Sequence, residues 1–151
     1  SLGSLLEADS RGRVNGGLGP DFLMTELTLI APNTVIEGNW GTLDLTISGV
    51  EMHFAHIPSE APDEVVVYFK DDNLLWGAEV IQGESYPNLH TIRGTRFRDP
   101  QNWYPGIDVM RGFNADILML SHGRPVVGAE HVEDTLTAYR DAIQFTYDQS
   151  V

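Results

Sequence analysis

The fold is decided by residues 65–79, which read VVVYFKDDNLLWGAE. Val65 to Phe69 is a continuous apolar run rich in β-branched side chains, and this composition predicts a strand that is buried on both faces. The polar residues 70–73 predict a turn. Leu74 to Ala78 predicts a second buried strand, which ends at Glu79. Two buried strands joined by a short turn indicate a central sheet in a layered domain.

Upstream of this stretch, apolar and polar residues alternate. The alternation covers residues 26–31, 43–47 and 50–54, and a period of two predicts strands with one buried face. Gly49 predicts a tight turn or a bulge before the last of these strands. Residues 56–64 form a loop fixed by two prolines, and this loop leads into the strand that begins at Val65.

Downstream, residues 80–101 show little periodicity and contain several Gly and Pro residues. Residues 102–113 have apolar side chains at helical spacing, and residues 116–120 predict another buried strand. Residues 130–147 predict a helix whose apolar face is formed by Val132, Leu136, Tyr139, Ile143 and Tyr147. Strands followed by strand–helix units predict an α/β or α+β layered domain.

Composition and net charge exclude several classes of partner and of active site. The chain has 151 residues, 22 acidic against 9 basic side chains, a formal charge of -13, 42% hydrophobic residues and no Cys. We expect one domain over residues 22–151, preceded by an irregular Gly-rich arm over residues 1–21. The charge argues against nucleic acids and anionic membranes as partners, and the absence of Cys excludes thiolate metal ligands and a Cys nucleophile. The start of the chain is not typical of a signal peptide, and no apolar run is long enough for a membrane helix.

Three polar residues share a position after rigid elements of the predicted domain. Glu60 follows a proline-containing loop, while Glu79 and His122 follow buried strands. The ends of strands are where α/β folds present functional side chains. Two carboxylates and an imidazole suit a metal such as zinc or manganese. The alternative is that all three are ordinary strand-end or turn residues, because no local metal-binding motif links them.

A second candidate site lies in the segment from Asn88 to Asp99. It contains three Arg residues in a chain that has only nine basic side chains. Planar guanidinium groups bind sulfate or phosphate through paired hydrogen bonds, so this segment predicts an anion pocket. The alternative is a surface loop whose Arg side chains pair with the abundant carboxylates.

Several ordered motifs resemble those of one enzyme family. They are Ser59-Glu60-Ala61-Pro62, Ala78-Glu79, Asn88-Leu89-His90-Thr91-Ile92-Arg93-Gly94, Arg98-Asp99, Ser121-His122 and Pro125. In this order they resemble the alkyl sulfatases of the metallo-β-lactamase superfamily, of the type that hydrolyses dodecyl sulfate. The resemblance runs from about Gly16 to the C-terminus.

The resemblance implies an αβ/βα sandwich with a mixed sheet, flanking helices and a site for two zinc ions. By motif match, Glu60 would bind one zinc, Glu79 would bridge both as the catalytic carboxylate, and His122 would bind the other. Asn88 and Arg93 would hold the sulfate group of an alkyl sulfate ester. Such a site needs no Ser or Cys nucleophile, because bound metal supplies a reactive water.

One part of the family pattern has no counterpart in these 151 residues. The His-x-His-x-Asp-His motif, which supplies the other metal ligands, lies upstream in the family. We therefore expect the chain to correspond to the second half of the catalytic domain. Its exposed apolar layer would be covered by a complementary N-terminal half or by another copy of the chain.

Two other functions remain open at this point. The chain could be a non-catalytic binding or assembly module that kept the fold without the chemistry, or a hydrolase of the same superfamily that acts on a phosphate or thioester. Related enzymes are often exported, but the sequence itself does not indicate a compartment.

Overall fold

The computed structural model describes residue 28, residues 30–90 and residues 97–151. The chain divides into two units, Ser1–Thr34 and Val35–Val151, and all the helices and strands described below belong to the second. The expected arm, residues 1–21, lies outside the described residues, so its boundary with the domain stays a prediction.

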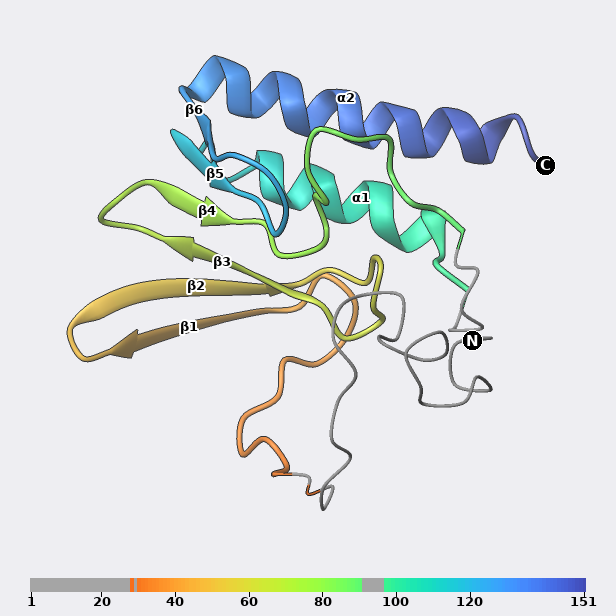
Figure 1. The fold of residues 1–151 in the computed structure, drawn as a ribbon. Helices are drawn as coiled ribbons and strands as arrows, with labels where there is room; N and C mark the ends of the chain where they lie inside the picture. Colours follow the sequence, from red (N-terminus) through yellow and green to blue (C-terminus); the bar gives the residue numbers. More distant parts are fainter. Residues whose placement is uncertain (1–27, 29, 91–96) are drawn as a thin grey trace, which may run out of the picture. The chain divides into compact units, whose positions relative to one another are not determined.

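Within the described residues, six strands form one mixed sheet (Figure 1). In sheet order they are β1 (Thr42–Ile47), β2 (Val50–His56), β3 (Val65–Phe69), β4 (Leu74–Trp76), β5 (Ile117–Met119) and β6 (Val126–Val127). Neighbouring strands are antiparallel except for β4 and β5, which are parallel. The sheet and its two helices confirm the expected mixed α/β architecture.

The turn between β1 and β2 is set by two residues with positive φ, Ser48 (53°) and Gly49 (85°). Positive φ at both central positions is the signature of the hairpin turn whose twist matches the strands that it joins. The pairing of Ile47 with Val50 closes the hairpin. The expectation of a tight turn at Gly49 is confirmed.

A helical crossover joins the parallel strands β4 and β5. Helix α1 (Pro100–Arg111) lies in this crossover, and Asp99 caps its start by accepting a hydrogen bond from the amide nitrogen of Gln101 at 3.0 Å. Pro100 suits the first helical position, where no amide donor is needed. The crossover brings Leu75 of β4 opposite Leu118 of β5.

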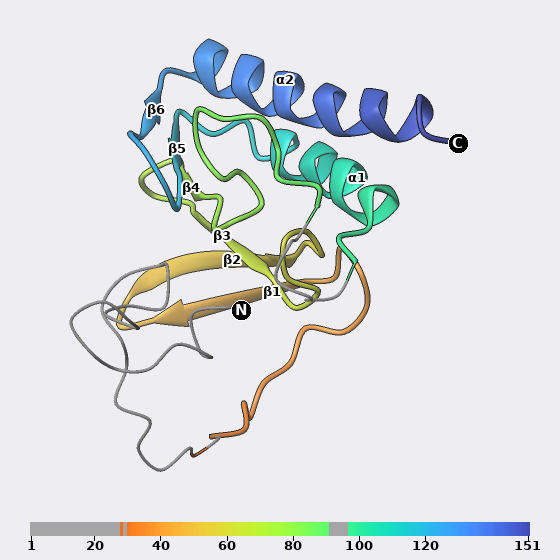
Figure 2. The same cartoon turned by 45° about the vertical axis from the view of Figure 1, so that its right-hand side comes forward.

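Helix α2 (Ala129–Asp148) follows β6 and runs beside α1 in the opposite direction, on the same face of the sheet (Figures 1 and 2). The core lies between these helices and the sheet. It is formed by Ala55, Val66, Leu75 and Leu118 from the strands, and by Trp103, Ile107, Met110, Val132, Leu136, Tyr139 and Ile143 from the helices. The apolar face predicted for the last helix is therefore confirmed at four of its five positions, because Tyr147 is only partly buried.

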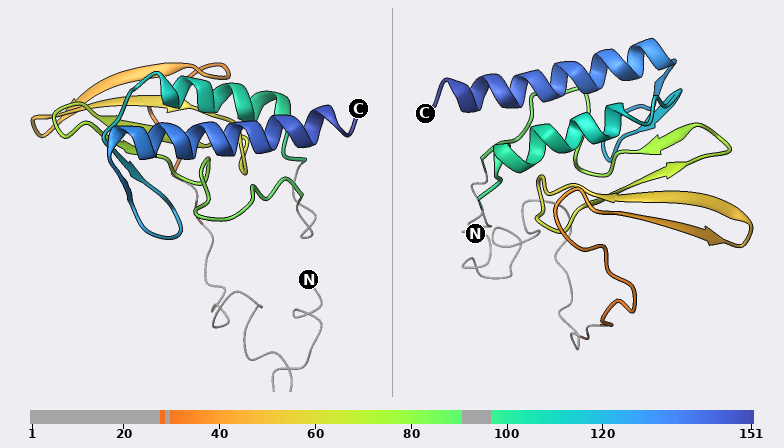
Figure 3. Two further views of the ribbon diagram at one scale, coloured as in Figure 1. Left: turned by 90° about the horizontal axis from the view of Figure 1, so that it is seen from above. Right: turned by 180° about the vertical axis from the view of Figure 1, so that it is seen from behind.

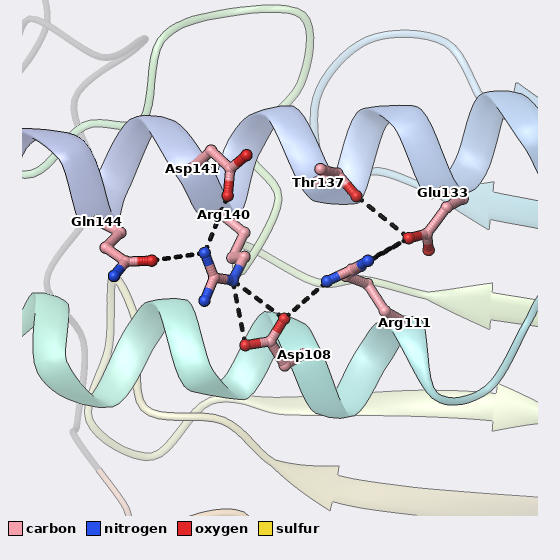
Figure 4. Close-up of polar contacts among 7 residues, drawn as sticks. All are labelled: Asp108, Arg111, Glu133, Thr137, Arg140, Asp141 and Gln144. Atoms are coloured by element: carbon pink, nitrogen blue, oxygen red, sulfur yellow. Dashed lines mark hydrogen bonds and ion pairs between the residues drawn. The ribbon is translucent and has the colours of Figure 1, made fainter.

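Polar side chains link the two helices along their outer side (Figure 4). Asp108 of α1 accepts hydrogen bonds from Arg111 Nη1 (3.0 Å) and from Arg140 Nε of α2 (3.0 Å). Arg111 in turn donates from Nε to Glu133 of α2 at 2.8 Å. Each pair is partly exposed to solvent, so the links contribute orientation more than stability.

Close packing between α1 and the loop after β2 depends on Gly106. A Cβ atom at this position would lie 2.3 Å from Cγ2 of Ile57, a fully buried side chain. Because real Cβ contacts are never that short, the absence of a side chain lets the helix approach the loop. This contact places α1 directly over the residues that lead to Glu60.

Figure 3 shows the helices on one face of the sheet, and the opposite face carries a row of apolar residues. Because successive strand residues point to opposite faces, Trp76 and Met119 point away from the face that buries Leu75 and Leu118. Cross-strand pairing aligns Leu43, Phe54, Val67, Trp76 and Met119 in one row. No helix of the described residues covers this row, and Trp76 is 48% exposed. In the same part of the chain, no helix combines the length and apolar character needed to cross a membrane.

Several expected elements differ from the structure. The strand predicted over residues 26–31 is wrong where it can be compared: residues 28, 30 and 31 are not in a strand, and Ile30 is 91% exposed. Alternation marks an apolar face, but a strand also needs a pairing partner, and Pro32 offers no amide donor. Helix α1 begins two residues earlier than predicted because Asp99 caps it, and the two-residue strand β6 was not predicted.

Candidate functional site

Glu79 lies just past the end of β4, in a turn with unusual backbone geometry. Gly77 extends the sheet by donating to the carbonyl oxygen of Met119 at 2.9 Å. Ala78 then adopts a φ of 46°, which a residue with a Cβ atom rarely does. The sequence predicts a strand up to Ala78, but this backbone conformation ends the strand at Trp76. Strained residues of this kind concentrate at functional sites, where surrounding contacts hold them.

His122 lies after β5, the strand that runs parallel to β4. Its Nε2 atom is 2.7 Å from Oε1 of Glu79. The two strands end at the same edge of the sheet, so residues far apart in the sequence meet there. The His122 side chain is 70% exposed and the Glu79 side chain 36%, so the pair is open to solvent and to ligands.

Gly83 brings the loop after Glu79 against the residue that carries the imidazole. A Cβ atom at Gly83 would lie 2.6 Å from the carbonyl oxygen of His122, and the φ of Gly83 is +130°. Both the space and the backbone conformation therefore require glycine. The loop that follows β4 and the loop that follows β5 are in direct contact.

Glu60 is held in a neighbouring polar network. Its carboxylate accepts a hydrogen bond from Nη2 of Arg98 on one oxygen and from Nε2 of Gln82 on the other. In this ion pair, Arg98 is only 7% exposed and Glu60 28%, so the charge of Arg98 is largely desolvated while Glu60 keeps some contact with solvent. Removing one partner of such a pair typically costs about 3–5 kcal/mol, because the other charge stays buried.

The three predicted metal ligands are therefore only partly brought together. Glu79 and His122 are in contact, whereas Glu60 pairs with Arg98. Among the described residues, no group of three or more His, Asp or Glu side chains is arranged to hold a metal ion.

The predicted sulfate-binding residues have different outcomes. Arg93 lies outside the described residues. Asn88 is exposed. Its backbone amide nitrogen donates to Oε1 of Gln82 (2.8 Å), and its backbone carbonyl oxygen accepts from Nη1 of Arg98 (2.5 Å). With the oxygen and nitrogen of its side-chain amide exchanged, both atoms of the Asn88 side chain find partners. The side-chain oxygen then accepts from Nη1 of Arg98 at 3.1 Å, and the side-chain nitrogen donates to the carbonyl oxygen of His90 at 2.6 Å. Arg98 therefore agrees with the second interpretation of this segment, in which an Arg side chain pairs with a carboxylate and does not form part of an anion pocket.

Gln82 is a functional candidate that sequence reasoning missed. It is buried, and it connects Glu60, Asn88 and the hydroxyl of Tyr139 on α2, which lies 3.2 Å from its Oε1. Burial raises the pKa of Tyr139 to about 12. The phenol therefore stays neutral and serves as a hydrogen-bonding group in the core.

Glu64 is the second candidate that the sequence analysis did not single out. Its carboxylate is buried and accepts hydrogen bonds from Ser59 Oγ (2.5 Å), from the amide nitrogen of Ala61 (3.4 Å) and from the amide nitrogen of Glu79. Burial raises the pKa of Glu64, and these donors oppose the rise. A glutamate directly before an apolar buried strand was the signal available in the sequence.

A hollow of about 480 Å³ borders this network. It lies between the loop that carries Glu60 and the start of α1, and it is lined by Pro58, Glu60, Pro62, Phe97, Arg98 and Asn102, among others. The hollow places two acidic residues, Glu60 and Asp99, and one basic residue, Arg98, at the same opening.

The residues present can be tested against a divalent metal. The imidazole nitrogen of His122 and the carboxylate oxygen of Glu79 are donors that zinc accepts, and they already meet at 2.7 Å. A carboxylate has about four acceptor positions, so Glu60 retains capacity beside its two donors. The donor set fits part of a metal site.

Comparisons with solved structures define the class of fold. The chain superposes on the stereoselective inverting sec-alkylsulfatase Pisa1 from Pseudomonas sp. with a TM-score of 0.73 and 28% identity, over 97% of this chain and 24% of that one. It also matches a metallo-beta-lactamase family protein from Thermus thermophilus with a TM-score of 0.58 and 15% identity, over 71% of this chain and 35% of that one. The fold is that of the metallo-β-lactamases.

Sequence comparisons identify the relatives of this chain among proteins with the metallo-β-lactamase fold. The chain is 45% identical to a linear primary-alkylsulfatase from Pseudomonas sp. over 151 residues, which is 100% of this chain and 28% of the relative. It is 33% identical to an alkyl/aryl-sulfatase from Saccharomyces cerevisiae, over 99% of this chain and 23% of that protein. No family model matches the chain. The resemblance seen in the motifs is confirmed: the chain is homologous to part of the alkylsulfatases and spans about a quarter of their length.

Proposed function

We propose that this chain forms part of the catalytic unit of a zinc-dependent hydrolase that cleaves alkyl sulfate esters. The observation that carries the proposal is the contact between Glu79 and His122, two metal-binding side chains held at the ends of parallel strands. The homology to alkylsulfatases over the whole of this chain supports the substrate class.

In this proposal, Glu60, Glu79 and His122 would hold the metal ions, with Glu79 shared between them. The family has two zinc ions per complete site, and zinc supplies a reactive water and a positive charge for the ester oxygens. The chain's own residues fix where these donors lie. The contacts of Gly83 and Ala78 hold Glu79 against His122, and the buried Arg98 holds Glu60 on the adjacent loop.

Asn88 and Arg93 would hold the sulfate group. Asn88 is exposed, and its backbone is held by Gln82 and Arg98, the two buried residues that also bind Glu60. An Arg side chain five residues further on can offer the planar pair of donors that sulfate accepts. This local positive charge would oppose the formal charge of -13.

The apolar row on the sheet face away from the helices supports a covering layer, because Trp76 is 48% exposed and Met119 36%. Trp76 and Met119 lie on this face, directly before the turns that lead to Glu79 and His122. A complementary half that carries the His-x-His-x-Asp-His motif would bury the row and add the other metal ligands. A second copy of the chain is the other occupant to test.

The function is tested by complementation. The chain is mixed with an upstream segment of an alkylsulfatase that carries the His motif, and release of sulfate from dodecyl sulfate is measured. We expect activity that depends on zinc and is lost in Glu79→Gln, while Glu84→Gln, an exposed carboxylate nearby, leaves it unchanged. A folded mixture without activity would contradict the proposal.

Zinc binding separates this function from a non-catalytic module of the same fold. With zinc at about 100 times its dissociation constant, the free energy of unfolding should rise by about 2.7 kcal/mol. We expect Glu79→Gln to abolish this rise. A non-catalytic module would show no such rise, and Glu79→Gln would leave its stability unchanged.

A further inference from the structure

We propose that Glu64 is a positioning residue that holds the backbone on both sides of Glu60 and at Glu79 in one fixed arrangement. The inference rests on the proposed function, because it concerns how two of the proposed metal ligands are placed. Glu64 itself would not contact metal or substrate.

The hydrogen bonds of its carboxylate carry the argument. Oε2 accepts from Ser59 Oγ at 2.5 Å and from the amide nitrogen of Ala61 at 3.4 Å, the residues directly before and after Glu60. Oε1 accepts from the amide nitrogen of Glu79. One planar group thus joins the loop after β2 to the turn after β4.

The backbone of Glu64 strengthens this arrangement. Its carbonyl oxygen accepts from the amide nitrogen of Ile57 at 2.9 Å, and inside the loop the amide of Ser59 donates to Ala61 at 3.0 Å. The loop is therefore closed at its base by the main chain of Glu64 and filled by its side chain. Only the side chain reaches out of the loop to Glu79.

Burial makes the residue unusual. Glu64 is 9% exposed, and burying a carboxylate is costly unless hydrogen bonds compensate. Three donors supply that compensation, and every one of them belongs to Glu60's neighbours or to Glu79. Because the carboxylate is buried and already accepts three hydrogen bonds from the protein, Glu64 is placed to orient ligands instead of acting as one.

The contact at Glu79 also explains how the turn after β4 is held. Ala78 has a φ of 46°, so the peptide that follows it is turned in a direction that a strand would not adopt. The Glu64 carboxylate binds the amide of that peptide, and the side chain of Glu79 then meets His122. Loss of the Glu64 carboxylate would release the turn after β4 and, with it, the side chain of Glu79.

The test compares zinc affinity with the stability of the metal-free chain. We expect Glu64→Gln to weaken zinc binding about 10- to 100-fold, as observed when groups that orient metal ligands are removed. Ser59→Ala, which removes one donor, should weaken binding less. Asp63→Asn, which makes the same charge change at an exposed neighbour, should leave it within about twofold, since exposed charges away from a site have small effects.

Metal-free chain provides the second measurement. Hydrogen exchange at the amides of Ala61 and Glu79 should become about tenfold faster in Glu64→Gln, as expected for the loss of one hydrogen bond, and should be unchanged in Asp63→Asn. The amide of Leu118 in the core reports global unfolding and should keep its rate if the variant is folded.

Two results would overturn the inference. One is zinc affinity in Glu64→Gln that equals the wild-type value or falls only as far as the metal-free stability does, which is what a merely structural residue would give. The other is unchanged exchange at Ala61 and Glu79. If the wild-type chain takes up no zinc even when it is mixed with the complementary half, the proposed function fails, and the exchange measurement still decides whether Glu64 positions these two segments.

Discussion

Gly83 and His122 are in contact through their backbones, and the space between them has no room for a methyl group: an added Cβ atom would lie 2.6 Å from the carbonyl oxygen of His122. We expect Gly83→Ala to displace the His122 loop and to lower the free energy of unfolding by about 1–3 kcal/mol. Zinc-dependent stabilisation should fall as well. Urea unfolding with and without zinc measures both effects.

Gly38→Ala is the matched control for this variant. Gly38 also has a positive φ, of 76°, but a Cβ atom there would meet nothing within 4 Å. The control should lose stability through backbone strain alone and keep its response to zinc. Equal responses to zinc in both variants would contradict a link between Gly83 and the site.

Gly106 gives a prediction about packing. Gly106→Ala would place a Cβ atom 2.3 Å from Ile57 and should destabilise the chain by about 1–3 kcal/mol, even though Ala favours helices. The same change in an Ile57→Ala background should cost less, because the conflicting atom is gone. Additive costs in a double-mutant cycle, measured by urea unfolding, would show that the two residues do not conflict.

Glu133 gives a prediction at acidic pH. Hydrogen bonds from Arg111 hold the pKa of Glu133 below its ordinary value of 4.5. A lowered pKa in the folded state contributes stability above the unfolded pKa, and this contribution is lost as the pH falls through the folded pKa. Wild type should therefore exceed Glu133→Gln in stability at neutral pH, by less than about 1 kcal/mol because the pair is exposed. A difference that grows as the pH falls would contradict this.

Tyr139 gives a prediction at alkaline pH, because its pKa is raised in the folded state, whereas that of Glu133 is lowered. Burial raises the pKa of Tyr139 from its ordinary value of 10.0 to about 12. A raised pKa contributes stability that is present below the unfolded pKa and is lost as the pH rises through the folded pKa. Tyr139→Phe should cost about 1 kcal/mol at neutral pH, through the lost hydrogen bonds with Gln82. This cost should shrink between about pH 10 and pH 12. A cost that stays constant up to pH 12 would argue against a buried phenol.

Much of the fold could be predicted because burial leaves a period in the sequence. The strands around residues 43–47, 50–54 and 65–69 and the last helix follow that period closely. Where local geometry decides, the pattern fails: Ala78 is apolar like its neighbours, yet its φ of 46° ends the strand. Residues 30 and 31 continue an alternation but are not in a strand, since pairing partners are not written in the pattern.

The candidate site was predictable to the same extent. Glu79 and His122 could be placed together because each follows a buried strand, and strand ends share an edge of the sheet. The ion pair between Glu60 and Arg98 depends on how two irregular loops fold onto each other, and no period records that. Glu64 and Gln82 are polar residues inside the core, and sequence patterns assign such residues to the surface.

The parallel pairing of β4 with β5 has a consequence for the order of folding. The antiparallel hairpins of β1, β2 and β3 join residues close in sequence, so they close at a small entropic cost. The pairing of β4 with β5 must wait until the long crossover through α1 has docked. Glu79 and His122 can meet only after that step, so their contact should be among the last to form when the chain is synthesised or refolded, and the first to be lost when the crossover loosens.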